Sequence, residues 1–181
     1  MADPASIRAF TERIAAHADR VNVLINDGAR YLEGTDLWDA DADADAITDT
    51  IAAGATGTLL TGKHNLPLLR ASVGADVVNV VSSAAKARNH RSQAHPAFYA
   101  AKAAQAGFAD VLSHRLRPEG IRVISRYPPG FADGDPLHST GDHASRTQDG
   151  SLTAQSVRGC VLFAIGQPRD CFIRSFYFEQ M

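Results

Sequence analysis

The sequence predicts an α/β fold in which one domain, residues 1–181, contains a mostly parallel sheet of about four strands. Short apolar runs alternate along the chain with longer segments in which apolar residues recur every three or four positions. This order is typical of parallel strands joined by crossover helices on both faces of a sheet. The 181 residues are 45% hydrophobic, which is enough for a single compact core.

The predicted helices begin where capping residues precede an apolar periodicity. Asp3 offers a side-chain acceptor at a helix start, and the ring of Pro4 suits the first helical turn. The second helix begins near Asp43 and runs toward Pro67. The predicted helices span about 4–18, 43–67, 97–115 and 153–166.

The predicted strands are short apolar runs that end in polar loops. The run VNVLIND leads into a loop through Gly28 and Gly34, and DVVNVVSS ends at Ser83, before a basic loop over 86–95. Residues 128–150 are rich in Pro, Gly and Asp and are predicted to form a loop. The predicted strands span 21–27, 76–83, 121–127 and 171–178.

Charge and hydropathy argue against several classes of partner. The chain has 20 acidic and 18 basic residues without long runs of one sign, so we expect no nucleic-acid partner. We also expect no membrane association and a cytoplasmic location, because the sequence has neither an eighteen-residue apolar stretch nor a signal peptide. Asp residues alternate over 36–45, which suits a solvated helix start better than a closed metal site, so no metal is predicted.

One stretch resembles the short-chain dehydrogenase/reductase family, whose signature is a Ser followed about a dozen residues later by YxxxK. Residues 82–112 read SSAAKARNHRSQAHPAFYAAKAAQAGFADVL, with Ser83 and Lys102 at signature positions and Phe98 in place of the Tyr. A Phe ring has no hydroxyl to exchange a proton, so the residue that carries the family's redox chemistry is missing. The order of elements resembles the family's last four strands, which implies a truncated Rossmann-like three-layer sandwich.

The same resemblance implies that nicotinamide dinucleotide binding is lost. In the family, the first strand leads into a GxxxGxG turn whose backbone approaches the pyrophosphate, and no GxxxGxG occurs in this sequence. The family's NNAG aligns with residues 26–29, which read NDGA, and its helical Asn aligns with Gly54. We therefore expect no bound cofactor.

Tyr99, Lys102 and Ser83 are the first candidates for catalytic residues. Tyr99 and Lys102 stand at i, i+3 spacing and would form an acid/base pair, or else Tyr99 packs at a helix interface while Phe98 fills the old pocket. Lys102 would have a lowered pKa in a dry pocket, or else its side chain extends to solvent. Ser83 ends a strand, where open α/β sheets place ligands and where loop Ser residues are also common.

His138 and His143 complete the candidate catalytic set. Both lie in the 128–150 loop, which lines substrate pockets in the family that the chain resembles. Histidine exchanges protons near neutral pH, although a loop His is also commonly just solvated.

The resemblance also predicts an exposed sheet edge. The family's strand order is 3-2-1-4-5-6-7, so removal of the first strand bares one edge of VNVLIND. We expect a homodimer that pairs this strand with its two-fold mate, or a homotetramer that also uses the YxxxK-like helix. A full-length relative is the alternative partner.

Three functions remain open. The first is a cofactor-independent small-molecule enzyme that performs isomerisation, elimination or cyclisation by acid/base chemistry in the old substrate pocket. The second is a catalytically inactive pseudoenzyme that acts as a ligand-binding or partner subunit. The third is one half of a split NAD(P)-dependent oxidoreductase. The first is favoured because Ser83, Lys102 and His-bearing loops remain at the strand ends.

Overall fold

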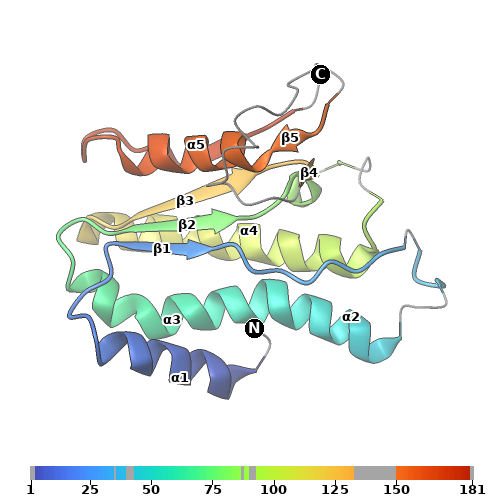
Figure 1. Cartoon of the computed structure of the whole chain (residues 1–181), viewed down its shortest axis with the longest axis horizontal. Helices are drawn as coiled ribbons and strands as arrows, with labels where there is room; N and C mark the ends of the chain where they lie inside the picture. Colours follow the sequence, from blue (N-terminus) through green and yellow to red (C-terminus); the bar gives the residue numbers. More distant parts are fainter. Residues whose placement is uncertain are drawn as a thin grey trace.

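The main feature of the computed structural model is a parallel sheet, whose strands lie side by side in Figure 1. The structure describes residues 3–34, 36–39, 43–86, 88–89, 93–132 and 150–179. Among them, four parallel strands pair in the order β1-β2-β3-β6, which confirms the predicted sheet. These strands are β1 (Val23–Asn26), β2 (Asp76–Val80), β3 (Arg122–Tyr127) and β6 (Ser175–Tyr177).

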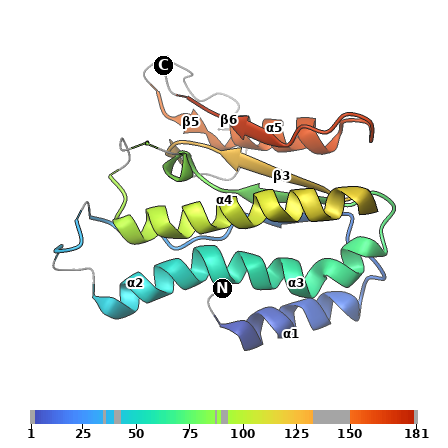
Figure 2. The ribbon, with the colours of Figure 1, turned by 180° about the vertical axis from the view of Figure 1, so that it is seen from behind.

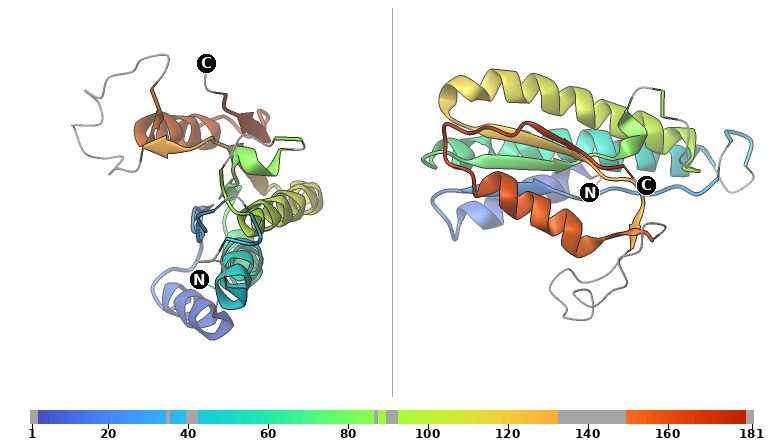
Figure 3. Two further views of the ribbon diagram at one scale, coloured as in Figure 1. Left: turned by 90° about the vertical axis from the view of Figure 1, so that its right-hand side faces the viewer. Right: turned by 90° about the horizontal axis from the view of Figure 1, so that it is seen from above.

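Helices cover both faces of this sheet. Figure 3 shows α5 on one side of the strands and the other long helices on the opposite side, and Figure 2 shows α4 crossing in front of the sheet. The predicted three-layer sandwich is therefore confirmed. The helices are α1 (Pro4–Ala15), α2 (Ala44–Ile51), α3 (Gly57–Arg70), α4 (Pro96–Leu116) and α5 (Ala154–Ile165).

Successive strand residues face opposite sides of the sheet and so build two cores. On the α5 side, Val78 and Ile124 pack against Val161 and Ala164. On the other side, the core draws on β1, β2, β3, α3 and α4. Its buried members are Leu24, Leu69, Ala75, Val77, Ala109, Leu116, Ile121 and Val123.

The helix starts agree with the capping signals. The Asp3 carboxylate accepts hydrogen bonds from the backbone N–H groups of Ala5 and Ser6, and Asp43 caps α2. A five-residue π-helix, η1 (Ala52–Thr56), joins α2 to α3 without a break. Helix α3 continues to Arg70, past the end predicted near Pro67. Burial of Leu69 in the core offsets the loss of the backbone hydrogen bond that Pro67 cannot make.

Residues 128–150, predicted to be a loop, contribute one strand to a short second sheet. Its strands β4 (Phe131–Ala132) and β5 (Leu152–Thr153) run parallel. Two-residue strands leave no apolar periodicity in a sequence, so the prediction missed them.

The β1 strand lies at one edge of the main sheet. In the described part of the chain it pairs with β2 and with no other strand. Val23 is 38% exposed and Ile25 is 50% exposed, since α5 packs over β2 and β3. The bare edge is confirmed, while the homodimer or homotetramer that would cover it stays a prediction. No helix within the described ranges has the length and apolarity needed to cross a membrane.

Candidate functional site

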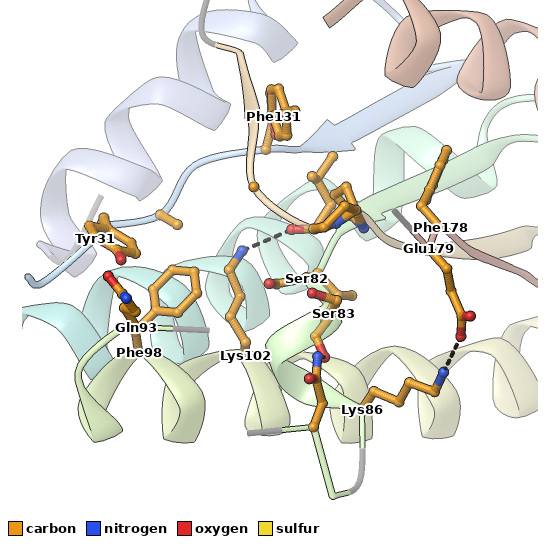
Figure 4. A pocket seen from close by; sticks show the side chains of 18 of the residues that line it. Tyr31, Ser82, Ser83, Lys86, Gln93, Phe98, Lys102, Phe131, Phe178 and Glu179 are labelled. Atoms are coloured by element: carbon orange, nitrogen blue, oxygen red, sulfur yellow. Dashed lines mark hydrogen bonds and ion pairs between the residues drawn. The ribbon is translucent and has the colours of Figure 1, made fainter. Parts of the chain in front are cut away.

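A cavity of about 880 Å³ lies at the carboxyl ends of the parallel strands (Figure 4). Open α/β sheets bind ligands at this end, because the loops that follow the strands converge there. Each strand of the main sheet contributes to the lining. The contributing residues are Asp27 and Ala29 after β1, Val81, Ser82 and Ser83 after β2, residues 128–130 after β3, and Phe178 and Glu179 after β6.

Lys102 of α4 brings an amine to this cavity. The side chain is only 4% exposed, and it lines the cavity from the α4 side. Nζ donates hydrogen bonds to the Val80 carbonyl oxygen at 2.9 Å and to Gln105 Oε1 at 3.1 Å. An ammonium carries three hydrogens, so these two bonds leave one position of the nitrogen without a protein acceptor among the described residues.

A chain of hydrogen bonds fixes the Gln105 amide. The Thr58 hydroxyl donates to the Gly54 carbonyl oxygen at 2.8 Å, so its oxygen is available to accept from Gln105 Nε2 at 3.0 Å. With its NH₂ group so engaged, Gln105 turns Oε1 toward Lys102. Gln105 is 1% exposed, so no solvent competes for these bonds.

Burial shifts the pKa values of Lys102 and Asp27, which both line the cavity. Burial lowers the pKa of Lys102 from 10.5 to about 8, against the attraction of the Asp27 carboxylate. Burial also raises the pKa of Asp27, and this effect outweighs the opposing attraction of Arg126 and Lys102. The two pKa values therefore move toward the neutral range from opposite sides.

Aromatic side chains form one end of the cavity. The rings of Tyr31 and Phe98 meet edge to face with centroids 5.2 Å apart. Lys102 Nζ lies 5.6 Å from the centroid of the Phe98 ring. Figure 4 shows these two rings together with Gln93 on one side of Lys102. Phe98 thus places apolar surface beside the amine, where the family signature has a phenol.

The opposite end of the cavity is more polar. Lys86 and Glu179 form an exposed ion pair at 2.8 Å, and Figure 4 shows them beyond Ser83. The backbone N–H of Ser83 donates to the Pro128 carbonyl oxygen at 2.8 Å, which ties the end of β2 to the loop after β3. The Asn89 amide donates to the Ser83 carbonyl oxygen at 2.7 Å.

The structure brings two of the five candidate residues together. Ser83 and Lys102 both line the cavity. Tyr99 is half-buried on α4 and is not among the described residues that line the cavity. His138 and His143 lie outside the described residues. The catalytic roles of all five stay predictions.

Gly54 has a packing role that the sequence does not reveal. It lies in η1, where a Cβ atom would come within 2.9 Å of the Ala101 Cβ on α4. An Asn side chain, which the family has at the aligned position, does not fit this close approach. The glycine lets the two helices meet one residue away from Lys102.

Sequence reasoning missed three residues of the site. Asp27 was only an aligned loop position, although a polar residue directly after a buried strand was a usable signal. Gln105 stands three residues after Lys102 on a helix, a spacing that places both on one face. Tyr31 lies on a loop and gave no signal. Among the described residues, no group of three His, Cys, Asp or Glu side chains is arranged to bind a metal.

Comparisons with known proteins agree with this geometry. The profile of the short chain dehydrogenase family matches residues 1–142. No curated protein matches the sequence. Solved structures of similar fold include an alcohol dehydrogenase from Thermococcus sibiricus, with a TM-score of 0.77 and 15% identity over 99% of this chain and 71% of that one.

Two further solved structures have the same fold. One is a short chain dehydrogenase from Burkholderia cenocepacia, with a TM-score of 0.76 and 23% identity over 99% of this chain and 72% of that one. The other is the aldohexose dehydrogenase of Thermoplasma acidophilum, with a TM-score of 0.77 and 15% identity over 97% of this chain and 73% of that one. At these identities the likeness shows the fold, and the family profile shows the membership. This chain of 181 residues belongs to the short-chain dehydrogenase family.

Proposed function

We propose that this chain is a cofactor-independent enzyme that moves a proton on a small molecule, with Lys102 as the proton-transfer group. The observation that carries the proposal is the buried amine that faces the cavity with two protein acceptors. A lysine with a pKa of about 8 exists as acid and as base near neutral pH, which general acid–base catalysis requires. Isomerisation, elimination and cyclisation all begin with such a transfer.

Asp27 and Ser83 have supporting roles in this proposal. The Asp27 carboxylate balances the ammonium charge when Lys102 is protonated. The hydroxyl of Ser83 offers a donor to a substrate oxygen at the end of β2. A group of this kind stabilises negative charge that develops on a carbonyl oxygen as the neighbouring carbon loses its proton.

A nicotinamide dinucleotide does not fit the residues present. The Burkholderia cenocepacia relative was solved with NADP, and the Thermococcus sibiricus enzyme with 5-hydroxy-NADP. In this chain Phe98 has no hydroxyl to exchange the proton that accompanies hydride transfer in the family. The proposed chemistry therefore includes no hydride transfer, and a split oxidoreductase would still lack the tyrosine.

Deuterium exchange tests the proposed function without a known substrate. The protein is incubated in D₂O with a panel of cyclic, acyclic and aryl ketones, and deuteration next to the carbonyl is followed by NMR. We expect Lys102→Met to lose exchange by a factor of about 100 or more, because general acid–base catalysis contributes on that order. Lys63→Met removes an exposed lysine and serves as the control. Equal exchange by the Lys102→Met and wild-type proteins would refute the proposal.

The open edge of β1 favours a second candidate, a catalytically inactive partner subunit. Backbone groups on this edge need a strand to pair with. Antiparallel pairing centred on Leu24 would set Val23 opposite Ile25 of a second copy, so that the exposed apolar side chains meet. The proposed partner is thus a second copy of this chain.

Sedimentation velocity tests this second candidate. We expect wild-type protein to sediment as a dimer or larger assembly, and Ile25→Lys to sediment as a monomer because the charge disrupts the strand junction. Val73→Lys, which changes a fully exposed side chain in the turn after α3, is the matched control. A wild-type monomer at high concentration would rule the candidate out.

A further inference from the structure

Lys102 differs from the other lysines of this chain in its surroundings. The chain has three lysines, and Lys63 and Lys86 are both exposed. Lys86 is also paired with Glu179 at 2.8 Å. Lys102 is 4% exposed and still lines a cavity of about 880 Å³, so a small molecule bound in the cavity would lie beside its side chain.

The hydrogen-bond geometry leaves one direction of Nζ open toward the cavity in either charge state. A neutral amine has two hydrogens and one lone pair. The Val80 carbonyl and Gln105 Oε1 accept two hydrogens from Nζ, and both are oxygens that cannot donate in return. Since the bonds through Thr58 hold the Gln105 amide in place, the amide cannot turn its NH₂ group toward Lys102. The lone pair is then left for the remaining direction.

We propose that Lys102 is a nucleophile that forms an imine with an aldehyde or ketone bound in the cavity. The lone pair of Nζ forms a bond to the carbonyl carbon, while the carbonyl π electrons move to oxygen, which takes up a proton as the nitrogen gives one up. The resulting carbinolamine loses water, a C=N bond forms, and no atom is oxidised or reduced. Hydrolysis reverses these steps and returns the free lysine.

The neighbours of Nζ support this chemistry. The Phe98 ring attracts the ammonium from 5.6 Å, but burial disfavours that charge and lowers the pKa, which favours a nucleophilic lysine. Asp27 is the acidic group that attracts Lys102, and Arg126 in turn attracts Asp27. The lowered pKa of Lys102 agrees with the geometry, because near neutral pH a usable fraction of the amine is then unprotonated.

This inference rests on the same residue as the proposed function and narrows its substrates to aldehydes and ketones. It adds a covalent bond that proton transfer alone does not need. A protonated imine withdraws electrons from the neighbouring carbon, which makes the proton on that carbon easier to remove. Imine formation and proton transfer by the free amine are separate steps, so an experiment can refute one without refuting the other.

Reaction with 2,4-pentanedione tests the proposal. This diketone condenses with amines to a stable enaminone that absorbs in the near ultraviolet, and peptide mass mapping identifies the modified residue. At pH 8 we expect Lys102 to react at least about tenfold faster than Lys63 and Lys86, because a far larger fraction of it is neutral. Lys102→Met should lose the fast phase. Reaction of Lys102 at or below the rate of the exposed lysines would overturn the proposal.

A second variant keeps the test independent of folding. Gln105→Glu preserves the shape of the side chain and places a carboxylate against Nζ, which raises the pKa of Lys102. We expect its enaminone formation at pH 8 to fall about tenfold with an unchanged circular dichroism spectrum, and an unchanged rate would contradict the assigned geometry. Deuterium exchange that depends on Lys102 without any adduct would leave proton transfer standing and remove the imine.

Discussion

The charged side chains at the two ends of the parallel sheet differ in how they are paired. At the amino ends of the strands, the Asp76 carboxylate accepts from Arg122 at 2.7 and 2.9 Å and from Arg169 at 2.8 Å. Arg122 also donates to backbone carbonyls at and beyond the end of α5, including that of Ile165 at 3.1 Å. At the carboxyl ends, Lys102 and Asp27 border a cavity, and neither forms an ion pair with another residue that the structure describes.

This difference separates structural charges from reactive ones. Arg122 is 5% exposed and has all three nitrogens bonded, so its charge is fully compensated and its pKa is raised. Lys102 is equally buried at 4% exposed, yet its pKa is lowered to about 8. The two side chains are equally inaccessible to solvent, but Arg122 is held charged by its hydrogen bonds to Asp76, whereas burial lowers the pKa of Lys102.

The largest effect is expected at the amino end. Asp76→Asn should lower the free energy of unfolding by about 3–5 kcal/mol, because it leaves the Arg122 charge buried without its counter-ion. Urea denaturation measures this loss. The reaction of Lys102 with 2,4-pentanedione should be unchanged, and a slower reaction would show that the two ends are coupled.

The next effect is expected at the carboxyl end of the sheet, where Lys102 should make the free energy of unfolding depend on pH. Because the pKa of Lys102 falls from 10.5 to about 8 on folding, the unfolded chain binds more protons between these values, and stability rises with pH in that window. The gain amounts to about 3 kcal/mol. It should appear as the difference between wild-type and Lys102→Met denaturation curves from pH 8 to 10.5. Parallel curves would contradict the lowered pKa.

Two glycine substitutions sharpen the comparison near the cavity. Gly54→Ala should destabilise the protein by about 1–3 kcal/mol, since its methyl group meets Ala101 at 2.9 Å. Gly107→Ala, on the open side of α4, has no atom within 4 Å and should stabilise the protein by roughly 0.5–1 kcal/mol. Thermal melting measures both. A neutral Gly54→Ala would mean that the helices separate easily.

The smallest effect is expected from Asp27→Asn. The Asp27 carboxylate raises the pKa of Lys102, so its removal should lower that pKa further. The pH profile of enaminone formation should then shift toward lower pH, with little change in the rate at high pH. A shift toward higher pH would show that Asp27 does not act on Lys102 through its charge.

Most of the fold followed from local patterns, whereas the site depended on contacts between distant segments. Apolar runs marked the four strands, and Asp3 and Asp43 marked helix starts. Ser83 and Lys102 followed from a motif. The contact between Tyr31 and Phe98 joins residues 67 positions apart on a loop and a helix, and neither periodicity nor composition carries such information.

The close contact between Gly54 and Ala101 was not predicted from the sequence, for a related reason. A glycine within a helical pattern normally lowers confidence in the helix, and nothing in the sequence names the partner that requires it. The cost of a side chain there depends on Ala101, which lies 47 positions later. Alignment with the family's Asn marked the position as different but gave no physical cause.

The exposed edge of β1 also affects the tendency of the purified protein to aggregate. Unpaired backbone groups beside exposed Val23 and Ile25 form a template onto which other extended chains can add. The charges of Arg20 and Asp27 flank this four-residue strand and act as gatekeepers against such growth. Storage life and yield of the purified chain will therefore depend on whether its edge is covered, whatever its cavity does.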